Sequence, residues 1–146
     1  MPEMTDARYM SAAEKGKVLK QWDAFLKGGM ADKLFTEALY HHLIQHCSFI
    51  AHYDRRGFYG YYFTRGDMRK RFLSQFDPAN GGRSVEIGMT YWLDGEYADI
   101  NRAMIETAGA YIPALAQDAE LTQRDADISE AKRLLAKHGL ELEDVG

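Results

Sequence analysis

The sequence has too few cysteines to cross-link the chain by a disulfide, and it has no long apolar segment to anchor it in a bilayer. Cys47 is the only cysteine among 146 residues, so no disulfide can form within the chain. Charged residues interrupt every apolar stretch well before the roughly 18 residues that a membrane-spanning helix needs. No charged leader followed by an apolar run opens residues 1–13. We therefore expect a soluble, cytoplasmic protein with one domain, because a chain of this length can bury a core without disulfides.

The sequence also lacks the signatures of several enzyme classes. Its glycines match neither the dinucleotide-binding fingerprint nor the phosphate-binding loop. His42 is not followed by the glutamate of the HExxH hydrolases, and Glu37 and His41 lack the spacing of di-iron helical bundles. No base lies three or four residues from Cys47, which favours a buried thiol over a nucleophile. We expect no cofactor, and we favour binding over catalysis without deciding whether the protein is an enzyme.

Helix signals occupy most of the chain. Ser11 and Glu14 have the spacing of a capping box, apolar residues then recur at helical intervals, and Gly28 with Gly29 predicts the helix end. A second helix is expected from a cap at Asp32 towards residue 57. A third is expected over about 65–76, capped by Thr64 with Asp67 three residues later.

A fourth helix is predicted from about Glu96, where apolar residues follow one another at steps of three or four. Pro113 is expected to kink or end this helix, because proline lacks the amide and clashes with the preceding turn. Gly139, after Lys137 and His138, predicts a helix stop near the C-terminus.

One segment has the period of a strand instead. Apolar residues alternate with others over 84–93, and the aromatic-rich segment 58–63 would be the natural partner. The predicted fold is thus mainly α, a single domain of about five helices, with room for one short antiparallel hairpin formed by 58–63 and 84–93. We divide it into a compact body over about 8–115 and an amphipathic helical C-terminal arm over about 116–142.

The C-terminal arm has a sparse apolar repeat. Four apolar residues are spaced by seven: Leu121, Ile128, Leu135 and Leu142. Such a repeat can form a seam against a second copy or a partner helix. It can equally let the arm fold back on the body, and the sequence leaves both interpretations open.

Charge is unevenly distributed along the chain. The net charge is −4, yet residues 54–71 carry six basic and two acidic side chains. Aromatic residues interleave with these basic ones, as in grooves that bind single-stranded nucleic acid. The candidate nucleic-acid residues are Arg55, Arg56, Tyr59, Tyr61, Arg65 and Arg69. The acidic sum of the whole chain argues against this function.

Three histidines suggest a metal site. His42 and His46 are four residues apart, which places both imidazoles on one face of a helix, and His52 could join them. The alternative, which we favour, is that the first two are interior imidazoles with hydrogen-bond partners.

These patterns rank three functions. First comes a small non-enzymatic binding or regulatory protein that acts through a protein partner or as a homodimer, with no membrane partner. Single-stranded nucleic-acid binding through residues 55–72 comes second. A metal-dependent enzyme or a metal-binding helical protein that uses His42, His46 and His52 comes third.

Overall fold

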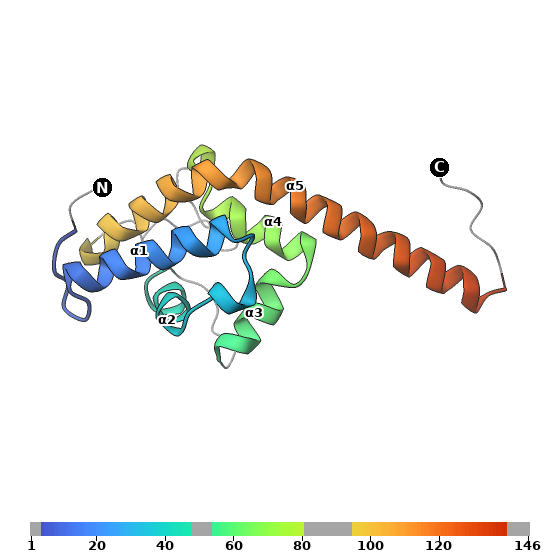
Figure 1. The fold of residues 1–146 in the computed structure, drawn as a ribbon, viewed down its shortest axis with the longest axis horizontal. Coiled ribbons are helices and arrows are strands. Elements are labelled where there is room, and N and C mark those ends of the chain that lie inside the picture. Colours follow the sequence, from blue (N-terminus) through green and yellow to red (C-terminus); the bar gives the residue numbers. More distant parts are fainter. Residues whose placement is uncertain (1–3, 48–53, 81–94, 140–146) are drawn as a thin grey trace.

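The computed structural model describes residues 4–47, 54–80 and 95–139, and the regular structure in these ranges is entirely helical (Figure 1). The α-helices are α1 (Ala12–Lys27), α2 (Glu37–His46), α3 (Arg55–Phe63), α4 (Gly66–Gln75) and α5 (Ala98–Lys137). Short 3₁₀ turns lie at Asp32–Leu34, Pro78–Asn80 and Gly95–Tyr97. The prediction of a mainly α domain with about five helices is confirmed.

The first helix begins and ends where its local signals place it. The Ser11 hydroxyl accepts a hydrogen bond from the Glu14 amide at 3.1 Å, and the Glu14 carboxylate accepts one from the Ser11 amide at 3.3 Å. Gly28 caps the other end, and Gly29 has a φ of 74°, a conformation that glycine adopts without strain. Both predictions for α1 are confirmed.

The second helix starts later than predicted. Asp32 begins a 3₁₀ turn, and α2 begins at Glu37 after Thr36, whose hydroxyl accepts the Leu39 amide at 3.1 Å. Asp32 was the wrong cap because α2 begins five residues later, and the Asp32 carboxylate instead pairs with Arg55 at 2.8 Å. The helix ends at His46, well short of residue 57.

The segment 58–63 is helical, so the predicted hairpin is wrong on this side. Asp54 caps α3, because its carboxylate accepts the Gly57 amide at 2.8 Å. Phe58, Tyr62 and Phe63 then all point into the core, at the spacing of one helix face. Aromatic residues favour strands only where a sheet offers them a surface to pack on. The other half of the hairpin, 84–93, lies outside the described residues.

The start of α4 was predicted one residue too early. Arg65 occupies the cap position without a side-chain hydrogen bond to the free amides of the helix, and Gly66 is the first helical residue. Thr64 is instead the C-cap of α3, where its hydroxyl donates to the Gly60 carbonyl at 2.5 Å. That local bond competes with the capping role expected of Thr64.

The last helix continues through its proline. Pro113 lies inside α5, which is 40 residues long, so the proline does not end the helix. The ribbon of α5 changes direction near its middle, in the orange part of Figure 1. Gly139, with a φ of 68°, follows the last turn as predicted.

The core is a cluster of aromatic side chains beneath α5. Trp22 of α1 is fully buried, with its ring centroid 4.7 Å from that of Phe76 and 5.9 Å from that of Phe72. Its indole N–H donates to the Met104 carbonyl of α5 at 2.9 Å. One side chain therefore connects α1, the α4 region and α5. Among the described helices, none is both long enough and apolar enough to cross a membrane.

The closest approach of α4 to α5 supplies a stability test. A Cβ added at Gly66 would lie 2.3 Å from the Ala119 carbonyl oxygen, whereas one added at exposed Gly60 would meet nothing within 4 Å. Gly66→Ala should therefore lower the free energy of unfolding by about 1–3 kcal/mol, because two backbones must separate. Gly60→Ala should raise it by about 0.5–1 kcal/mol, since alanine favours a helix interior. Urea unfolding measures both, and a destabilised Gly60→Ala would contradict the helical assignment of 58–63.

Candidate functional site

The C-terminal part of α5 extends away from the body (Figure 1). The last polar contacts with α4 come from Asp118, Glu120 and Gln123: Arg69 lies 3.6 Å from Asp118, Lys70 lies 3.0 Å from Glu120, and the Asp67 amide donates to Gln123 at 3.1 Å. Beyond this point, the described hydrogen bonds and ion pairs stay within α5, as between Glu130 and Arg133 at 2.7 Å. We call residues 124–137 the projecting segment.

Apolar side chains on this part of α5 face solvent. Leu121 is 51% exposed, Leu134 41% and Ile128 39%, while Leu135 is partly exposed. Residues three, four and seven apart share one side of a helix, so these side chains and Ala131 form one broad row, interrupted between Leu121 and Ile128 by the charged Arg124 and Asp125. We call this row the apolar stripe: Leu121, Ile128, Ala131, Leu134 and Leu135. Leu142, the fourth residue of the predicted repeat, lies outside the described residues.

The predicted nucleic-acid residues are mostly engaged with carboxylates or carbonyls. Arg55 pairs with Asp32 at 2.8 Å and Arg65 with Asp67 at 2.9 Å. Arg69 donates to the Phe63 carbonyl at 2.6 Å, in addition to its pairing with Asp118. Neighbouring acidic groups thus offset much of the positive charge that phosphates would meet.

The tyrosines of the same segment differ in exposure. The Tyr59 hydroxyl donates to the Met30 carbonyl at 2.8 Å, and burial raises the pKa of this half-buried phenol. Tyr61 is 43% exposed, and Arg56 is exposed on the same helix. Nucleic-acid binding stays a prediction that the structure does not test.

The histidine pair belongs to a buried polar network. The rings of His42 and His46 lie 5.3 Å apart, and His46 stacks on Tyr97 at 3.6 Å. His52 lies outside the described residues. Within 4–47, 54–80 and 95–139, no three histidine, cysteine or acidic side chains are grouped so that they could hold a metal ion.

Asn101 is the centre of this network. Its side-chain carbonyl accepts from His42 Nε2 at 2.8 Å and from the Cys47 thiol at 3.3 Å, and its amide donates to the His46 carbonyl at 2.9 Å. Asn101 is fully buried, so α2 and α5 meet through one amide. The sequence prediction missed this residue. Its only signal was a polar side chain between Ile100 and Met104 on the predicted buried face.

Lys15 brings a buried charge to the same region. Its ammonium donates to the Glu96 carbonyl at 2.5 Å and to the Asp99 carboxylate at 2.8 Å. Burial alone would raise the pKa of Asp99, but hydrogen bonds from Lys15, from Thr5 and from the Ile100 amide bring it down to about 2. The pair holds the first turn of α5 against α1.

The network contains no activated group. Burial lowers the pKa of His42 to about 4, against the opposing effect of its hydrogen bond to Asn101, and nearby His46 and Lys15 lower it further. Burial raises the pKa of the Cys47 thiol well above its ordinary value. Neutral imidazole and neutral thiol at pH 7 suit a structural network rather than acid–base or nucleophilic chemistry.

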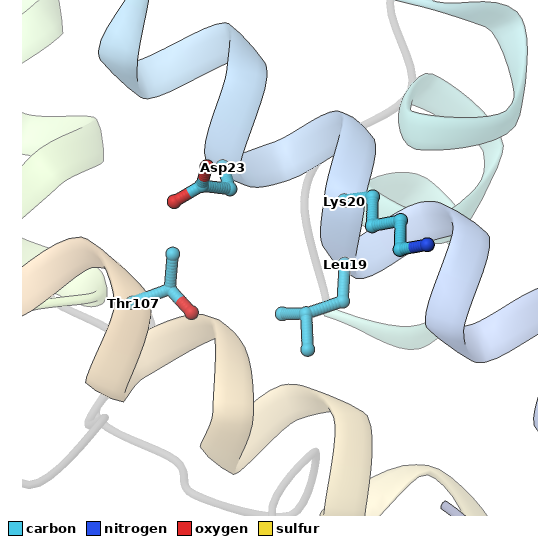
Figure 2. Close-up of a pocket in the computed structure, with 4 residues that line it drawn as sticks. All are labelled: Leu19, Lys20, Asp23 and Thr107. Carbon is cyan, nitrogen blue, oxygen red and sulfur yellow. The ribbon is translucent and has the colours of Figure 1, made fainter. Parts of the chain in front are cut away.

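A surface hollow lies apart from these residues. It has a volume of about 320 Å³, lies between α1 and α5, and is lined by Leu19, Lys20, Asp23 and Thr107. Figure 2 shows Asp23 and Thr107 facing each other across the hollow, while the Lys20 side chain points away along α1. The Asp23 carboxylate already accepts the Tyr111 hydroxyl at 2.8 Å. None of the sequence-predicted site residues that the structure describes lines the hollow.

In comparisons with known proteins, the chain matches no family model, no curated protein and no solved structure.

The neutral state of His42 predicts a pH dependence. The unfolded chain has an ordinary imidazole pKa near 6.5 and therefore takes up a proton before the folded chain does. Stability should be intact above pH 6.5 and fall by about 3 kcal/mol as the pH drops from 6.5 to 4. His42→Gln, which can still hydrogen-bond to Asn101, should remove most of this slope.

The matched control is His41→Gln, which changes an exposed imidazole on the same helix. Its unfolding free energy should follow the wild-type pH curve. The pKa of His46 is also lowered by burial and by Lys15, so a smaller slope should survive in His42→Gln. If the unfolding free energies of wild type and His42→Gln depended on pH in the same way, the assignment of His42 as a buried, neutral imidazole would be contradicted.

Proposed function

We propose that this protein is a non-enzymatic binding protein that associates with a second copy of itself through the apolar stripe. The observation that carries the proposal is the exposure of Leu121, Ile128 and Leu134 on a helix that leaves the body. An amphipathic helix stabilises itself mainly by burying its apolar side. Here the described body does not cover that side beyond Gln123.

The energetic gain from pairing would be substantial. Fully burying a leucine or isoleucine side chain contributes about 1.5–3 kcal/mol, and a symmetric dimer counts each residue twice. Pairing would also suppress fraying of a segment of 14 residues, a length at which an isolated helix is marginal in water. Self-association would therefore stabilise both the interface and the helix that forms it.

Folding back of the stripe on the body was the alternative left open by the sequence. In the structure, α5 is continuous from Ala98 to Lys137, and its C-terminal part points outward. This arrangement favours a partner outside the chain. We also propose a reducing, cytoplasmic location, supported by the single, fully buried thiol of Cys47.

A charge placed on the stripe tests this function. Ile128→Glu should weaken self-association at least about tenfold, because two carboxylates would have to be buried in the dimer interface. Sedimentation equilibrium or light scattering over a range of protein concentrations gives the dissociation constant.

The control is Ala126→Glu, which adds the same charge on the opposite side of the same helix turn. It should leave the dissociation constant within about twofold of wild type. Circular dichroism would verify that both variants remain helical. A wild-type protein that is monomeric at every concentration, or an Ile128→Glu variant that dimerises as wild type does, would contradict the proposal.

A further inference from the structure

The charges on the outer part of α5 are segregated along its length. Residues 118–130 carry five acidic side chains and one basic one, and residues 131–137 carry three basic side chains and no acidic one. The boundary lies at Glu130 and Arg133, which pair at 2.7 Å. Asp118 and Glu120 face Arg69 and Lys70 of α4, whereas the printed partners of Asp127 and Glu130 lie on α5 itself, at Gln123 and Arg133.

This order of charges distinguishes the two ways in which two copies could pair. Parallel helices in register place acidic half beside acidic half and basic half beside basic half. Antiparallel helices place the acidic half of each copy beside the basic half of the other. Opposite charges across a helix pair fix its orientation, and like charges disfavour the wrong one.

The position of the body points the same way. The described part of the body lies at the N-terminal end of the projecting segment (Figure 1). A parallel pair would bring two bodies to one end and require them to fit side by side. An antiparallel pair places them at opposite ends, where only the segments need to touch.

We infer that two copies of this chain pair through their projecting segments in antiparallel orientation, with the two-fold axis near Ile128 and Ala131. This inference rests on the proposed self-association and adds its orientation. In this arrangement Ile128 of one copy lies near Ile128 and Ala131 of the other. Leu121 then lies beside the Leu135 region of the partner, and Asp125 approaches Lys132. The stripe of each copy covers the stripe of the other.

Cysteine cross-linking tests the orientation directly. The only native thiol, Cys47, is fully buried, so a Cys47→Ala chain offers a clean background, and the native chain serves if that change unfolds the protein. Single cysteines are placed by Ile128→Cys, Leu121→Cys and Leu135→Cys, and a short bismaleimide is added. At 1.5 Å of rise per residue, two copies of Leu121 lie about 20 Å apart or more in an antiparallel pair, yet adjacent in a parallel one.

The expected result is cross-linked dimer from Ile128→Cys alone and from a mixture of Leu121→Cys with Leu135→Cys. Leu121→Cys alone and Leu135→Cys alone should give at least about tenfold less product, at the level of random collisions. Ala126→Cys, on the opposite side of the helix, measures that collision level.

Each other outcome has a distinct meaning. Efficient cross-linking of Leu121→Cys with itself, without mixed product, would show parallel pairing and overturn this inference while leaving the proposed self-association intact. Collision-level product at all three stripe positions in a chain that is still dimeric would place the interface elsewhere. A chain that is monomeric throughout would remove the proposed function and this inference together.

Discussion

The packing of the first half of α5 against α1 and α4 is the constraint on which the rest of the structure depends. Ile100, Met104 and Ala108 are fully buried there. The indole N–H of Trp22 donates a hydrogen bond to the Met104 carbonyl in the α5 backbone. Gly66 then allows α4 to approach α5 at Ala119 so closely that a methyl group would not fit. Because α5 stays helical through Pro113, fixing its first half also constrains the direction of its second. The direction of the projecting segment is therefore set by the packing of the first half of α5 against α1 and α4.

Buried polar contacts select one position for α5 along the body. Asn101 joins α5 to α2 through His42 and the His46 carbonyl, and Lys15 joins it to α1 through Asp99. A slide of α5 by one turn would leave these buried groups without partners, at a cost of about 1–3 kcal/mol each. Apolar contacts alone tolerate such slides more easily. We interpret His42 and His46 as part of the buried polar contacts that fix the position of α5 along the body.

Local signals could be read from the sequence, and long-range ones could not. The capping box at Ser11 and the glycines after Lys27 gave both ends of α1, because those interactions span only a few residues. The segment 58–63 was a possible strand only as a partner for 84–93, whereas the local cap at Asp54 starts the helix α3 there. Asp32 is not the cap of α2, which begins after Thr36, and its carboxylate pairs with Arg55, 23 residues later.

In the candidate site, too, local features could be predicted from the sequence and long-range contacts could not. The seven-residue spacing of Leu121, Ile128 and Leu135 was visible in the sequence, since it is a property of one helix. Whether the body covers these side chains depends on where α5 leaves it, which no local pattern encodes. Asn101 was missed for the same reason, because His42 lies 59 residues away in the chain.

Hydrogen exchange along α5, measured at several protein concentrations, tests the central claim most directly. The account predicts that amides in 98–115 are protected at every concentration, because the body packs on them. Amides in 124–137 should exchange fast in dilute protein and become protected as the concentration rises and two copies pair. Exchange in 124–137 that does not change with concentration would contradict the claim that a second copy covers this segment.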